Sequence, residues 1–177
     1  QLWSNSSRNC KQLRLVQRDQ FPDFYKNYFP QDLWEAKISE TKATCDRCNW
    51  TEYQPDLKCC TYEPFLPNYL VGAALKAEST NNTTKSVLLK KMTDRNYALP
   101  IGMVASPRFQ VRFNNREADE FGQRRDWLCP YYSVENQNCG IWRHRGAVCT
   151  TYYCQSSYGV MGTEFWKQMS DYLTYVE

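Results

Sequence analysis

The chain has 177 residues, nine of them cysteines, and a formal net charge of +3. This length suits one domain, and so small a net charge gives no case for nucleic acid as a partner. No apolar run approaches the roughly 20 residues needed to cross a bilayer, so the sequence predicts no membrane span. Aromatic residues make up 15% of the chain, and their side chains supply much of the apolar area available for a core.

The N-terminal stretch differs in composition from the rest of the chain. Residues 1–30 mix polar with aromatic side chains, and we expect an N-terminal arm with a short helical piece near 21–29. Residues 31–177 are predicted to form one cysteine-cluster metal-binding domain. A helix is expected at its start, over 31–40, followed by a cysteine-bearing loop over 44–63.

The clearest helix signal covers residues 66–75. Pro67 suits a first helical position, where its missing N–H costs nothing. We expect residues 78–85, which are polar, to form a surface loop and residues 86–93 to form a short helix. The predicted apolar face of the first of these helices comprises Leu66, Leu70, Ala73, Ala74 and Ala77.

Further along, residues 108–113 alternate polar side chains with Phe109, Val111 and Phe113, which is typical of a half-buried strand. Residues 127–154 are expected to be loops with little regular structure. Residues 163–176 predict a closing amphipathic helix, whose apolar face would carry Phe165, Met169, Tyr172, Leu173 and Val176. The predicted fold is a single, mostly α-helical domain with long irregular cysteine-bearing loops and a short β element.

Eight of the nine cysteines fall into close pairs, and Cys10 stands apart. A CxxC turn aims two sulfurs at one point, whereas adjacent cysteines rarely bond to each other because the ring they would close is strained. Thiolates gathered in this way bind zinc or the iron of iron–sulfur clusters. The predicted metal ligands are therefore Cys45, Cys48, Cys59, Cys60, Cys129, Cys139, Cys149 and Cys154.

The choice of metal depends on the ligand types and their spacing. The single histidine, His144, favours an all-cysteine site and is itself expected to face solvent in a basic loop. Irregular spacings suit a cluster in a loop pocket, because each iron needs only one thiolate. We expect an iron–sulfur cluster, with [4Fe–4S] as the expected type and zinc as the alternative. Nearby aromatics would keep water from the metal, namely Trp127, Tyr131, Tyr132, Trp142, Tyr152 and Tyr153.

The expected role is electron transfer, or stabilisation of a larger assembly with a protein partner. No hydrolase, zinc-protease or nucleotide-binding motif is present, which favours a binding protein over an enzyme. The alternative is a secreted, disulfide-stapled binding protein with one cysteine left over. Its support is the polar composition and glycosylation sequons such as Asn49-Trp50-Thr51.

Two segments resemble the YkgJ-like cysteine-cluster family of zinc- or iron-chelating proteins, which is related to flagellin lysine N-methylase. The resemblance covers roughly residues 44–155. It departs from the family in the ten residues between Cys48 and Cys59, and in Gly146, where the family has proline. The matching motifs are Cys45-Asp46-Arg47-Cys48 with Cys59-Cys60, then Cys129-Pro130-Tyr131-Tyr132, Cys139-Gly140-Ile141-Trp142, Arg145 and Cys149.

This resemblance implies a cytoplasmic module that binds a metal or an iron–sulfur cluster, whereas the disulfide alternative would place the chain outside the cytoplasm, secreted or periplasmic. Among the N-methylase relatives, the resemblance implies a cluster coupled to methyl transfer onto lysine. A methyltransferase-like enzyme is therefore a further alternative.

Overall fold

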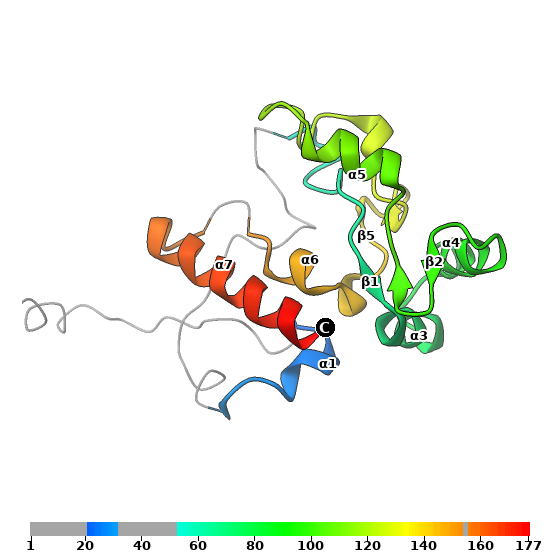
Figure 1. Ribbon diagram of the computed structural model, residues 1–177, viewed down its shortest axis with the longest axis horizontal. Helices are drawn as coiled ribbons and strands as arrows, with labels where there is room; N and C mark the ends of the chain where they lie inside the picture. The colour runs from blue at the N-terminus through cyan, green and yellow to red at the C-terminus, as the bar shows by residue number, and fades with distance from the viewer. Residues whose placement is uncertain (1–20, 32–52, 154–155) are drawn as a thin grey trace, which may run out of the picture.

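A computed structural model describes residues 21–31, 53–153 and 156–177. Over these residues the chain is about 47% helical, with two small antiparallel sheets (Figure 1). The predicted class, mostly α with a short β element, is confirmed. Nearly all of the predicted helix over 31–40 lies outside the described residues, as do Cys10, Cys45, Cys48 and Cys154. Across the described ranges, no helix combines the length and apolar character needed to cross a membrane.

Six α-helices lie in the described ranges, together with two 3-10 helices and five two-residue strands. The α-helices are α1 (Asp23–Lys26), α3 (Asn68–Lys76), α4 (Asn82–Thr93), α5 (Pro107–Asn114), α6 (Ala147–Thr151) and α7 (Gly159–Val176). The 3-10 helices are η3 (Arg125–Trp127) and η4 (Trp142–His144). The strands are β1 (Leu66–Pro67), β2 (Ala98–Leu99), β3 (Gly102–Met103), β4 (Tyr132–Ser133) and β5 (Asn138–Cys139).

The helix predicted over 66–75 begins two residues later than expected, because Leu66 and Pro67 form strand β1. This strand pairs antiparallel with β3, which in turn pairs with β2. Pro67 therefore precedes α3 as its N-cap residue and is not its first helical residue. On the buried face of α3, Val71 takes the place predicted for Ala73, which is exposed.

Helix α4 begins at Asn82, four residues before the predicted start at 86. The cause is the Asn81 side chain, whose Oδ1 accepts a hydrogen bond from the backbone N–H of Thr84 at 2.7 Å. An N-cap of this kind satisfies a backbone donor that would otherwise have no partner in the helix. The predicted loop over 78–85 consequently ends at Asn81.

Residues 108–113 form most of helix α5, so the predicted strand is wrong. Ser106 caps the helix by accepting a hydrogen bond from the Phe109 N–H at 3.1 Å, and Pro107 occupies the first turn. Phe109 and Phe113 are four residues apart and therefore lie on one helix face, with their ring centroids 5.7 Å apart. Val111, between them, is 60% exposed.

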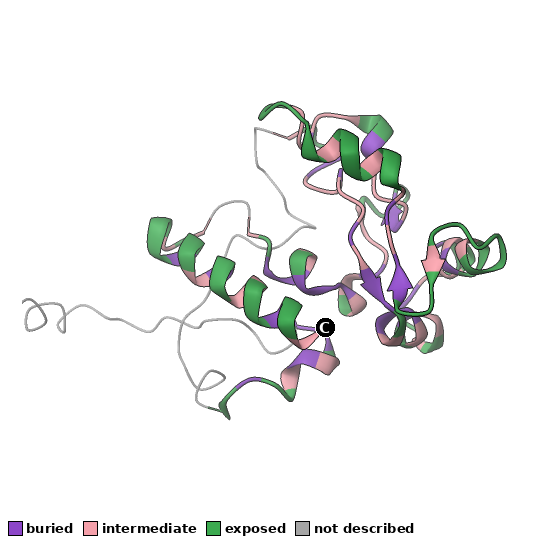
Figure 2. Cartoon of the chain, viewed as in Figure 1, coloured by how far each residue is buried: buried purple, intermediate pink, exposed green. Residues whose placement is uncertain are grey.

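The closing helix is confirmed as α7, which starts at Gly159. Its buried residues are Gly162, Trp166 and Leu173. Trp166 thus replaces the predicted Tyr172, which is 43% exposed. Helix α7 packs against α6, and its outer side is exposed along most of its length (Figure 2).

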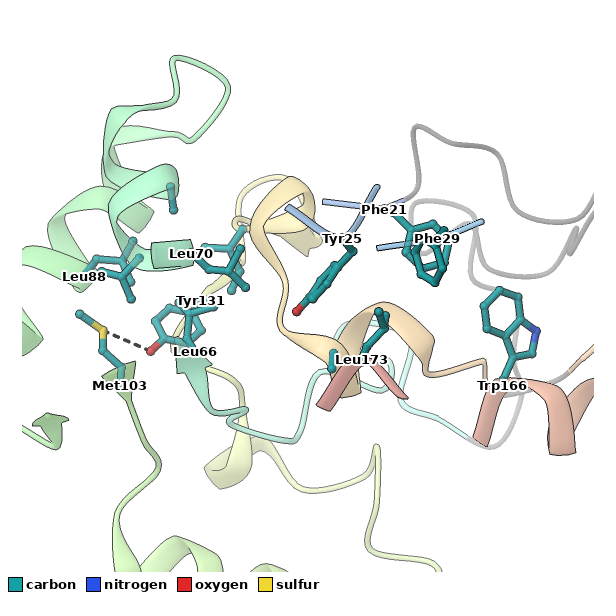
Figure 3. Packing of buried hydrophobic residues seen from close by; sticks show 14 residues of the cluster. Phe21, Tyr25, Phe29, Leu66, Leu70, Leu88, Met103, Tyr131, Trp166 and Leu173 are labelled. Atoms are coloured by element: carbon teal, nitrogen blue, oxygen red, sulfur yellow. Dashed lines mark hydrogen bonds between the residues drawn. The ribbon is translucent and has the colours of Figure 1, made fainter. Parts of the chain in front are cut away.

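The hydrophobic core joins segments from both ends of the described chain (Figure 3). The predicted helical piece near 21–29 is present as α1. The aromatic residues that flank α1 pack against α7, where the ring of Phe21 stacks on that of Trp166 with the centroids 6.5 Å apart. The domain boundary at residue 30 stays a prediction. The fully or nearly buried core residues include Phe21, Tyr25, Phe29, Leu66, Leu70, Leu88, Met103, Tyr131, Trp166 and Leu173.

Candidate metal centre

A cavity of about 800 Å³ collects cysteines from three separate stretches of the chain. They come from the loop before β1, from the segment around the β4–β5 hairpin, and from helix α6. No disulfide joins any two of these five. The five predicted ligands that line the cavity are Cys59, Cys60, Cys129, Cys139 and Cys149. The other three, Cys45, Cys48 and Cys154, lie outside the described residues.

Backbone hydrogen bonds connect Cys60, in the loop before β1, to the segment around the β4–β5 hairpin. The Cys129 N–H donates to the Cys60 carbonyl at 2.8 Å, and the Cys129 carbonyl accepts from the Tyr132 N–H at 3.0 Å. In the hairpin, Tyr132 of β4 stands opposite Cys139 of β5. Cys60 is thereby joined to Cys129 and Cys139, about 70 residues further along the chain, in one continuous backbone network.

Gly140 allows helix α4 to approach this network closely. A Cβ atom at position 140 would lie 2.0 Å from the Thr84 Oγ1 and 2.9 Å from the Tyr131 carbonyl oxygen. The Gly140 N–H donates to that same carbonyl at 2.9 Å. Any larger residue would displace α4 or the segment that follows Cys139.

Arg145 supplies a fixed positive charge to the lining of the cavity. Its side chain is buried, and it donates from Nε to the Trp142 carbonyl and from Nη1 to the Cys149 carbonyl, both at 3.0 Å. The guanidinium also lies 3.4 Å from the centroid of the Trp142 ring. A cation held in this way favours negative charge on nearby sulfurs. Arg143, by contrast, is exposed.

The sulfurs are close enough to influence one another. Burial raises the pKa of the Cys129 thiol well above its usual value, and negative charge on Cys139 and Cys149 raises it further. Several thiolates in this cavity would therefore repel each other unless a cation compensated their charge. Thiolate sulfur is a soft donor that suits zinc and the iron of iron–sulfur clusters, so the donor set fits the predicted kind of site.

The five cysteines contribute to the lining of one cavity. Within residues 21–31, 53–153 and 156–177, no three side chains of His, Cys, Asp or Glu are gathered closely enough to hold one ion. The described cysteines thus share a cavity and do not converge on one point.

Five of the twelve other lining residues are aromatic, and the sequence prediction anticipated only some of them. Of the aromatics predicted to surround the metal, Trp142 and Tyr152 line the cavity. The others named for that role do not line it: Trp127, Tyr131, Tyr132 and Tyr153. Further lining residues come from outside the cysteine motifs and were missed: Tyr62, Phe113, Arg116 and Phe121. The Ser106-Pro107 cap was the signal that Phe113 lies on a helix.

His144 does not face solvent as predicted. It is half-buried and lines a second, polar cavity of about 370 Å³, which shares Cys139 and Trp142 with the cysteine cavity. Its Nε2 atom is buried and has no hydrogen-bond partner among the described residues. Burial lowers the pKa of the His144 imidazole, which favours its neutral form.

Comparison with models of protein families, with curated proteins and with solved structures gives no match to this chain.

Proposed function

We propose that this chain is a metal-binding protein whose cysteine thiolates hold an iron–sulfur cluster in the 800 Å³ cavity. The observation that carries the proposal is the shared lining of that cavity by five cysteines from three separate stretches.

The spacing of the cysteines along the chain favours a cluster over a single zinc ion. A tetrahedral zinc site draws four ligands onto one ion, with sulfurs about 2.3 Å from it. A cluster distributes its ligands over several irons, with one thiolate to each. Cysteines at irregular spacings from three stretches of the chain therefore suit a cluster better. Cys45, Cys48 and Cys154 remain predicted ligands.

The role proposed for the cluster is electron transfer, or stabilisation of an assembly with a protein partner. Arg145 would offset part of the negative charge of a thiolate-ligated cluster from its buried position. A reducing compartment such as the cytoplasm keeps thiols from oxidising, so we place the protein there.

The test is anaerobic purification followed by measurement of iron, acid-labile sulfide and zinc, together with a visible absorption spectrum. We expect iron and sulfide in equal amounts and a broad thiolate-to-iron absorption band. Cys129→Ser and Cys149→Ser should each lower the bound iron. The matched control is Cys10→Ser, which alters the one cysteine that belongs to no pair and should leave the iron content unchanged.

Two results would contradict the proposal. Zinc without iron or sulfide would identify a zinc module. A count of about one thiol in metal-free protein, denatured without reductant, would identify the disulfide framework.

A further inference from the structure

The cysteine cavity also has an aromatic end, whose rings are not ligands of the proposed cluster. Its rings form a continuous wall: Tyr62 and Phe113 have centroids 4.9 Å apart, Phe113 and Phe121 6.0 Å, and Phe121 and Tyr152 5.7 Å. All four line the cavity. They come from the loop before β1, from α5 and the segment that follows it, and from the end of α6.

The exposed side chain of Arg116 lies against this wall. The Arg116 guanidinium lies 4.0 Å from the Phe113 ring centroid and 5.9 Å from that of Phe121. Its Nη1 donates to the Phe113 carbonyl at 2.7 Å, which holds the group in place. Among the described residues no carboxylate pairs with Arg116, whereas nearby arginines are paired, as in Arg112–Asp126, Arg124–Glu120 and Arg125–Asp56.

We propose that this end of the cavity binds a small organic acid, with an aromatic body against the ring wall and a carboxylate on Arg116. Rings favour a flat apolar body, and a positioned guanidinium favours a carboxylate, which it can meet with two parallel hydrogen bonds. A cationic ligand is disfavoured because Arg116 already covers the face of Phe113. The cavity volume of about 800 Å³ falls within the range of about 300–1,000 Å³ that is usual for small-molecule sites.

The test is isothermal titration calorimetry of the full chain with two probes, naphthalene-2-carboxylate and naphthalene-2-carboxamide. They share the aromatic body, but only the first carries a negative charge. We expect the carboxylate to bind about tenfold more tightly than the amide, since a charge-assisted bond is about twice as strong as a neutral one. Phe121→Ala should weaken the binding of both probes.

The critical variant is Arg116→Gln, which should remove the difference between the probes. Arg108→Gln is the matched control, because Arg108 lies on α5 but does not line this cavity. Arg116→Lys, which keeps the charge but loses the planar fork, should retain part of the difference. Circular dichroism would confirm that each variant is folded.

Three results would overturn the inference: no binding by the unmodified chain, equal affinity for the two probes, or a preference for the carboxylate that survives Arg116→Gln. The last result would show that another cation, such as Arg145 of the same cavity lining or a bound metal, receives the carboxylate. The inference does not require a cluster. If the protein contains iron and sulfide but binds neither probe, the proposed function stands and this inference fails. If the protein contains no metal but binds the carboxylate through Arg116, this inference stands and the proposed function fails.

Discussion

The side chain of Glu177 ties together segments from both ends of the described chain. Its Oε1 accepts a hydrogen bond from the hydroxyl of Tyr25, a core residue of α1. The same oxygen accepts a hydrogen bond from the Ala147 N–H, at the start of α6, at 2.7 Å. Burial raises the pKa of this carboxyl above its ordinary value, and the two hydrogen bonds offset only part of that effect. In the folded chain, Glu177 therefore holds its proton to higher pH than it does in the unfolded chain.

This shift predicts a pH dependence of stability. Because the folded-state pKa of Glu177 is raised, its stabilising contribution is complete below the unfolded-state pKa and is lost as pH rises through the folded-state pKa. The free energy of unfolding should fall across that window. Glu177→Gln should reduce the fall, since a neutral amide still accepts both hydrogen bonds through its Oε1. Urea denaturation at a series of pH values would measure it.

The control for this experiment is Glu135→Gln, which neutralises an exposed carboxylate in the β4–β5 turn. It should leave the slope of stability against pH unchanged. An equal slope in Glu177→Gln and the unmodified chain would show that burial of Glu177 does not control this behaviour.

At the scale of elements, short polar caps decide where helices begin. Asn81 starts α4 four residues earlier than its apolar pattern indicates, and Ser106 turns an alternating segment into helix α5. Both caps bear on the candidate site: α4 supplies Thr84, which contacts the Gly140 backbone region, and α5 supplies Phe113 of the ring wall.

Loss of the α5 cap has a measurable cost. Ser106→Ala should lower the free energy of unfolding by about 1 kcal/mol, because the Phe109 N–H loses its acceptor. Ser86→Ala is the control, since Ser86 is exposed in the interior of α4 and alanine is the better helix former. It should leave stability unchanged or raise it slightly. Equal losses in the two variants, measured by urea denaturation, would contradict the capping role.

At the scale of the whole molecule, one core joins the ends of the described chain to its middle. Phe21, Tyr25 of α1, Leu66 of β1 and Leu173 of α7 belong to the same buried cluster. Helix α6, which carries Cys149, packs against α7. The packing of α7 therefore supports one wall of the cysteine cavity.

Truncation of the core should be costly because it leaves a void. Leu173→Ala is expected to lower the free energy of unfolding by about 2–5 kcal/mol, since the side chain is fully buried. The matched control on the same helix is Tyr175→Ala, at a side chain that is 89% exposed. Its effect should stay within about 0.5 kcal/mol. Chemical denaturation of both variants measures the contrast, and similar losses would contradict the assignment of the buried face.

Features that depend on local chemistry can be read from the amino-acid sequence. Close cysteine pairs identified the candidate ligands, and the spacing of Leu70 and Ala74, or of Phe165, Met169 and Leu173, predicted helices α3 and α7. These signals lie within a few residues of one another, so one stretch of chain contains all the information. The same locality explains the error at α5: Phe109, Val111 and Phe113 satisfy the period of a strand, while Phe109 and Phe113 also satisfy that of a helix.

Which distant groups share a surface follows from the tertiary structure and not from the sequence pattern. It placed Cys60 beside Cys129 through a backbone hydrogen bond, buried Arg145 against Trp142, and set Arg116 over Phe113 at the aromatic end of the cavity. In that packing Trp166 is buried in the core, whereas Tyr172 is exposed. The physical reason is that burial and proximity depend on how all the elements pack together, and no periodicity within a single segment encodes that packing.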